Sequence, residues 1–205
     1  MSFITTYCHI TDRNCYLNGK LVASFDPGSS DSWLKQLYKF NNVTYPKFYK
    51  MDTLSQCGYL ASEFIKASNP DRFTSYADDR IAMVFANRCS SAESDIRFQN
   101  SYEVLQTPSP AMFVYTLPNI VIGEIAIANK WYGENMFAVL PKFAPDFFIN
   151  YAEILFSSGS EAVLAGWLDV TEVKVNAFVI LLEKNTGGIK SNIVNLTELI
   201  EEAFT

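Results

Sequence analysis

The residues of this chain that could do covalent or acid–base chemistry are few and scattered. The 205 residues include four cysteines, Cys8, Cys15, Cys57 and Cys89, and a single histidine, His9. No two cysteines form a CxxC pair, so we expect reduced, mostly buried thiols. A zinc site built from Cys8, His9 and Cys15 is conceivable, but its spacing fits no closed tetrahedral site, and we expect no metal and no cofactor.

The most informative turn joins the apolar run Met136–Leu140 to a helix predicted over Phe143–Phe156. In α/β domains, catalytic groups collect at the carboxyl ends of strands, and a helix amino terminus stabilises negative charge there. The turn reads Pro141-Lys142, and neither these residues nor their neighbours up to Ala144 carry a thiol or hydroxyl. A lysine nucleophile would need burial or a neighbouring cation to lose its proton, so we expect Lys142 to be solvated.

Other candidates for chemistry have simpler interpretations. Cys89 follows the second predicted strand, and we expect a small buried thiol there. Asp78-Asp79 and the run 93–95 read as solvated loop charges. The Gly/Ser-containing turns at 28–30 and 157–160 lack the lysine and the spacing of a phosphate-binding loop.

The elements that must position these residues follow from apolar periodicity. Residues 1–25 read as strand material with a hairpin turn at Asn18-Gly19, because Asn-Gly between apolar runs favours a tight turn. Further strands are expected at 80–86, 136–140, 162–168 and 177–182. Helices are expected at 32–40, 51–67, from 116–118 to about 130, 143–156 and 196–204. This order predicts a single α/β domain over 1–205, with a layered, mixed five-stranded sheet and helices on both faces.

Composition excludes several function classes. The net charge of −6 disfavours binding to nucleic acid or to an anionic membrane surface. The longest apolar stretch, Ile120–Ala128, is interrupted by Gly123-Glu124 and is too short to span a bilayer. The start, Met1–Thr6, has no basic region or cleavage site of a signal peptide, so we expect a cytoplasmic protein.

The segment Tyr132–Ala144 resembles the active-site segment of β-ketoacyl synthases, in which a Gly-containing turn, a strand and a Cys at a helix start follow one another. Four more segments resemble this family in the same order: Lys50–Ser55, Ile81–Arg88, Pro118–Ala126 and Ala162–Asp169. The resemblance covers nearly the whole chain. It is to the amino-terminal half of a thiolase-type fold, most like the stand-alone β-ketoacyl synthase-like, N-terminal proteins, and it implies one half of that fold.

The departures from the family pattern bear on activity. The family's nucleophilic Cys falls at Lys142, its two catalytic His belong to the unmatched carboxyl-terminal half, and His9 lies near the other end of this chain. Condensation needs a thiolate and imidazoles. The resemblance therefore implies a catalytically silent ketosynthase-like subunit, paired with an active ketosynthase or another component of a fatty-acid, polyene or pigment-type pathway.

Partnership is also expected from packing. In the thiolase-type fold, the helix after the nucleophile lies between two sheets, so here one apolar face of 143–156 should need a partner chain, a second copy or a local segment to cover it. The resemblance implies dimers that pair through the edge strand 136–140. The expected interface residues are Met136, Phe137, Ala138, Val139, Leu140, Phe143, Phe147 and Ile154. The choice between homodimer and heterodimer stays open.

A basic stretch suggests a second kind of partner. Lys35, Lys39, Lys47 and Lys50 lie in a segment without acids between Asp31 and Asp52. Such a patch could dock an acidic acyl carrier protein, or could simply be a solvated basic face. The alternative function is therefore a non-catalytic module that binds an acyl chain or an acyl carrier protein. An enzyme with an unrelated site is a third reading, for which the sequence gives no sign.

Overall fold

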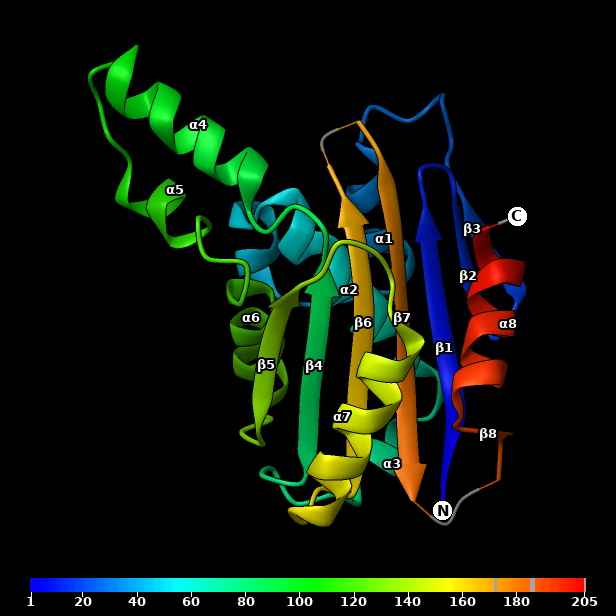
Figure 1. The fold of residues 1–205 in the computed structure, drawn as a ribbon. Coiled ribbons are helices and arrows are strands. Elements are labelled where there is room, and N and C mark those ends of the chain that lie inside the picture. The colour runs from blue at the N-terminus through cyan, green and yellow to red at the C-terminus, as the bar shows by residue number, and fades with distance from the viewer. Residues whose placement is uncertain (172, 185–186, 205) are drawn as a thin grey trace.

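The computed structural model describes residues 1–171, 173–184 and 187–204 (Figure 1). The strands are β1 (Ser2–Thr11), β2 (Asn14–Leu17), β3 (Lys20–Ser24), β4 (Ile81–Asn87), β5 (Asn135–Val139), β6 (Ala162–Val170), β7 (Val175–Lys184) and β8 (Ile189–Lys190). The helices are α1 (Trp33–Phe40), α2 (Thr53–Ser68), α3 (Pro70–Thr74), α4 (Ala92–Glu103), α5 (Pro110–Val114), α6 (Ile120–Asn129), α7 (Pro145–Ser157) and α8 (Ile193–Phe204), and a 3₁₀ helix, η1, spans Pro46–Lys50.

Within the described residues, eight strands form one mixed sheet in the order β3-β2-β1-β7-β6-β4-β5, with β8 paired to β1. The strands β5, β4 and β6 are parallel, and β7 runs antiparallel to both β6 and β1. The carboxyl ends of β4, β5 and β6 therefore meet at one end of the sheet. That end positions both the Lys142 turn and the residues that follow β4.

The prediction of a mixed α/β sheet with helices on both faces is confirmed, but the number of five strands is wrong. The expected five form the path β5-β4-β6-β7-β1, and the sheet continues beyond β1 through β2 and β3. Asn18 and Gly19 join β2 to β3 with φ of 50° and 75°, the left-handed pair that a two-residue hairpin requires. Residues 1–25, counted as one of the five predicted strands, thus form the three strands β1, β2 and β3.

Helices cover the two faces of the sheet differently. Helix α2 packs against β1, β6, β7 and α6, and with α1 it covers one face. Helices α7 and α8 lie on the other face and contact one another, with α7 over β4 and β6 and α8 beside β1 (Figure 1). Strand β4 is buried along its whole length, as its continuous apolar run predicts. No described helix has the length and apolarity needed to cross a membrane.

Helix boundaries differ from the predictions where proline or charge decides. Helix α7 begins at Pro145, not Phe143, since proline is favoured at the first helical position and Ala144 is still extended with φ of −128°. The run 93–95, predicted as loop, lies in the first turn of α4. Because that helix carries few apolar residues, the sequence has no apolar periodicity there that would predict a helix. Helices α4 and α5 project beyond the end of the sheet (Figure 1).

Candidate functional site

The β5–α7 turn carries no group suited to nucleophilic chemistry. The backbone N–H of Leu140 donates to the carbonyl of Asn87 (2.9 Å), which holds the end of β5 against β4. Lys142 follows in an exposed bend. Pro145 at the start of α7 removes one of the N–H donors that would otherwise bind an anion at this helix end. The turn thus offers neither a nucleophile nor a full set of amide donors.

Aromatic packing takes the place of polar groups at this turn. The ring of Phe143 stacks on Phe148 (5.3 Å between centroids) and meets the edge of Trp167 (6.1 Å). Phe147 contacts Phe148 and stacks on Tyr151. These rings extend the apolar cluster between the sheet and helices α7 and α8. The residues beside Lys142 therefore anchor the helix to the sheet.

His9 lies far from the Lys142 turn. It sits on β1, which is four strand positions from β5, a separation of roughly 19 Å at the usual spacing of strands. Its side chain is buried, and its Nε2 lies 2.8 Å from Oδ1 of Asn176. Burial lowers the pKa of His9. His9 and Lys142 cannot act on one reacting atom.

Three of the four cysteines occupy the buried positions expected of them, and one does not. Cys8, Cys15 and Cys57 are buried and unbridged, whereas Cys89 is exposed at the carboxyl end of β4, so the prediction of a buried Cys89 is wrong. The strand ends two residues before it, and the chain leaves the core there. Cys8 and Cys15 face the α2 side of the sheet, their sulfurs 3.9 Å apart, and His9 faces the α8 side. No group of three His, Cys, Asp or Glu side chains that could hold a metal ion occurs in the described ranges.

The four predicted lysines lie on two neighbouring elements. Lys35 and Lys39 are on α1, and Lys47 and Lys50 are on η1. The ammonium of Lys39 pairs with the carboxylate of Asp31, so the stretch is partly neutralised. Lys47 and Lys50 are exposed.

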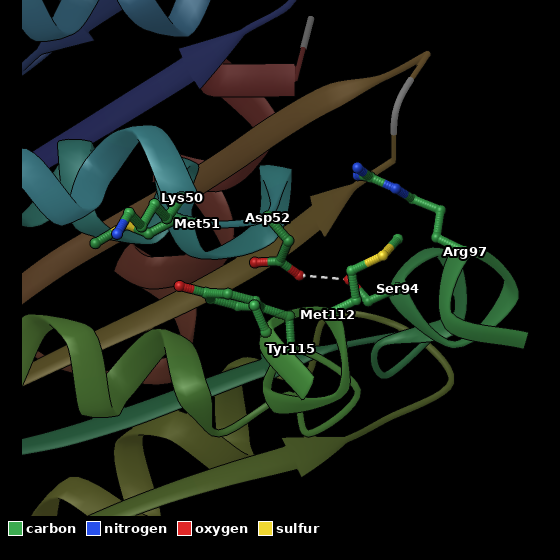
Figure 2. Close-up of a pocket in the computed structure, with 8 residues that line it drawn as sticks. Lys50, Met51, Asp52, Ser94, Arg97, Met112 and Tyr115 are labelled. Carbon is green, nitrogen blue, oxygen red and sulfur yellow. Dashed lines mark hydrogen bonds between the residues drawn. The ribbon is translucent and has the colours of Figure 1, made fainter. Parts of the chain in front are cut away.

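Lys50 also lines a cavity of about 110 Å³ at the carboxyl end of the sheet, together with Asp52, Ser94, Arg97 and Tyr115 (Figure 2). Asp52 caps α2 by accepting the N–H of Ser55 (2.9 Å), and its other oxygen accepts the hydroxyl of Ser94 (2.8 Å). The sequence did not link Arg97 to this region, because α4 was not predicted. Lys50 and Arg97 lie on opposite sides of this cavity, with the carboxylate of Asp52 between them (Figure 2).

The open edge of β5 is the clearest interaction feature. The backbone N–H of Met83 in β4 donates to the carbonyl of Glu134, just before β5, and the N–H of Leu140, just after β5, donates to the carbonyl of Asn87 in β4. Alternate residues of β5 therefore direct their N–H groups toward β4. The N–H groups of Phe137 and Val139 consequently point to the outer edge, where no described strand pairs. Val139 is 54% exposed, and no charged residue lies within 136–140. Such an edge is suited to pairing with another chain.

The structure distributes the predicted interface residues unevenly. Met136, Ala138, Leu140, Phe143 and Phe147 are half-buried against the α7–α8 cluster, and Phe137 packs on the other face of the sheet. Ile154 is exposed.

The outer side of α7 is mixed in polarity, and whether a partner covers its apolar part, where Ile154 is 58% exposed, stays a prediction. Asn150 and Glu153 lie exposed on its outer side, and α8 covers the adjoining sheet surface. The local segment that covers this face of the sheet is thus the helix that ends the chain.

Comparisons with known proteins identify the fold. No protein-family model and no curated protein sequence matches the chain. Among solved structures, the ishigamide ketosynthase/chain length factor matches with a TM-score of 0.67 and 14% identity, over 90% of this chain and 62% of that chain. The ketosynthase ApeO in complex with its chain length factor ApeC, from Xenorhabdus doucetiae, matches with a TM-score of 0.61 and 15% identity, over 91% and 81%. The type II polyketide synthase complex AntDE:AntF matches at 0.59 and 13%, over 90% and 63%.

These matches extend over nearly all of this chain, while the chain spans about 62% of the length of the first of them. The predicted thiolase-like arrangement is confirmed. The chain has the fold of ketosynthase and chain length factor structures.

Proposed function

We propose that this chain is a ketosynthase-like subunit without condensing activity, which pairs with an active ketosynthase or another component of a fatty-acid, polyene or pigment-type pathway. The observation that carries the proposal is the combination at β5: an open, uncharged strand edge runs directly into a turn in which Lys142 stands where the resemblance places a nucleophilic Cys. Two of the similar structures are complexes or pairs of a ketosynthase with a chain length factor, which supports this kind of partnership.

The chemistry at the turn supports catalytic silence. Lys142 is exposed, and Pro145 removes an N–H donor from the helix end. The sole histidine, His9, lies four strand positions away. Acyl transfer by covalent catalysis requires a nucleophile, and residues 140–144 of this turn carry no thiol or hydroxyl.

The experiment compares condensation by the purified chain alone, by a ketosynthase alone and by the two together, with malonyl- and acyl-carrier proteins as substrates. We expect no product from the chain alone and no effect of Lys142→Ala on the activity of the pair. Turnover by the chain alone that Lys142→Ala abolishes would contradict the proposal.

A second candidate is a non-catalytic module that binds an acyl carrier protein or acyl chain. The observation that favours it is the exposure of Lys47 and Lys50 on one 3₁₀ helix, with Lys50 at the rim of the cavity in Figure 2. Binding of an acidic carrier protein is then lost in Lys47→Glu/Lys50→Glu and kept in Lys20→Glu, an exposed lysine on β3. Equal binding by both variants would contradict carrier docking at this rim.

A further inference from the structure

A second, larger cavity lies on the α8 side of the sheet. It encloses about 600 Å³, within the range of small-molecule sites. Strand β1 contributes Tyr7, His9 and Thr11 from alternate positions of one face, and Asn176 of β7 lies beside them. Elsewhere this face of the sheet is apolar: Val163, Ile180 and Leu182 are examples. The change from aliphatic to aromatic and polar side chains coincides with the cavity.

The floor of the cavity is built from ordered rings and amides. His9 stacks on Tyr16 (6.1 Å between centroids), and its Nε2 lies 2.8 Å from Oδ1 of Asn176. The hydroxyl of Tyr16 accepts a hydrogen bond from Nδ2 of Asn14 (3.1 Å). Because His9 is buried and these contacts fix its ring, the floor is pre-formed rather than assembled by a ligand. A pre-formed aromatic floor is suited to a flat or apolar molecular body.

The rim of the cavity carries net negative charge. Glu202 of α8 and Asp12 after β1 both line it, and one carboxylate oxygen of Asp12 accepts the backbone N–H of Val175. Glu202 lies close enough to Tyr7 to help raise the pKa of its hydroxyl, after the larger effect of burial. The one cation of the lining, Lys174, directs its ammonium to Asp169 (3.2 Å), which lies outside the cavity. The chain's net charge of −6 adds a field of the same sign.

We propose that this cavity binds a small organic cation, an amine with a flat or apolar body, whose ammonium lies between Glu202 and Asp12 and whose body rests on Tyr7, Tyr16 and His9. Carboxylates provide charge-assisted hydrogen bonds to the ammonium, and aromatic faces attract it further. The site does not depend on the proposed ketosynthase partnership, because every lining group belongs to one chain and lies away from the β5 edge.

The test titrates the full chain alone with benzylamine, benzyl alcohol and benzoate, followed by amide NMR. Benzylamine should shift the amides of β1, β7 and the end of α8, and benzoate should not. Glu202→Gln should weaken benzylamine binding about tenfold, the loss of one charge-assisted contact. Tyr16→Leu should weaken it as well, and Glu198→Gln, an exposed acid on the same helix outside the cavity, should leave it unchanged.

Equal shifts with all three probes, shifts confined to other surfaces, or no response to millimolar benzylamine would each overturn the proposal. A Glu202→Gln chain that binds as tightly as the parent would do the same. Thermal unfolding of each variant confirms that it is folded before titration. Because no partner is present, failure here leaves the proposed subunit role standing, and failure of that role leaves this site standing.

Discussion

The backbone amide of Leu140 bonds to the carbonyl of Asn87, and this contact fixes which edge of β5 is open. Together with the matching bond from Met83 to Glu134, it directs the amide of Ala138 inward and that of Val139 outward. The two neighbouring positions therefore have opposite roles.

Proline substitutions separate these roles. Ala138→Pro removes a bond within the sheet and should lower the free energy of unfolding by about 3 kcal/mol. Val139→Pro removes only an outward N–H, so it should cost much less stability. Urea unfolding of both variants measures the difference. Equal destabilisation would show that the register deduced for β5 is wrong.

Two glycines make a matched pair for packing. A Cβ at Gly166 of β6 would lie 2.6 Å from a ring carbon of Phe85, whereas one at Gly123 of α6 would meet nothing within 4 Å. Gly166→Ala should lower the free energy of unfolding by about 1–3 kcal/mol through overpacking. Gly123→Ala should raise it by roughly 0.5–1 kcal/mol through helix propensity. The order of the thermal midpoints checks both, and a more stable Gly166→Ala chain would contradict the packing described here.

A fully buried carboxylate holds α3 to the sheet. Glu183 accepts hydrogen bonds from Arg72 (2.8 Å) and from the hydroxyls of Thr5 and Tyr76. Arg72→Met leaves this charge without its cation and should cost about 3 kcal/mol of unfolding free energy. Arg80→Met, which breaks an exposed pair with Asp79 and a hydrogen bond to the carbonyl of Gly159, should cost clearly less than Arg72→Met. Similar losses in denaturant titrations of the two variants would refute the importance assigned to Glu183.

The pH dependence of stability should carry the signature of His9. Burial lowers its folded-state pKa below the ordinary value of 6.5, so the unfolded chain binds more protons between the two values. The stabilisation is complete above about pH 6.5 and is lost as the pH falls toward the folded-state pKa. Urea midpoints of the parent chain should fall more steeply than those of His9→Gln between about pH 8 and about pH 5.5. Parallel profiles would indicate that His9 is solvated.

Local chemistry explains what could be predicted from the sequence. Asn18-Gly19 predicted its hairpin because few residue pairs adopt two left-handed conformations, and the apolar run of β4 predicted a strand buried on both faces. The order of strands and helices, with the quoted motifs, indicated the fold.

Long-range placement explains the rest. Residues 92–103 form α4 although they carry no apolar stripe, so neither the helix nor the presence of Arg97 at the cavity that Lys50 lines could be predicted. The cavity beside His9 is lined by β1, near the start of the sequence, and by β7 and α8, near its end. No local pattern encodes such a meeting. The β5 edge residues were predicted by resemblance, and their role in pairing stays a prediction.

The most direct test of the account is native mass spectrometry of this chain co-expressed with a β-ketoacyl synthase from the same organism. We predict a one-to-one complex that Val139→Lys abolishes and that Leu21→Lys preserves, since Leu21 is equally exposed on β3, at the opposite edge of the sheet. A chain that stays unpaired with the ketosynthase, or a complex that Val139→Lys leaves intact, would contradict the proposed pairing through β5.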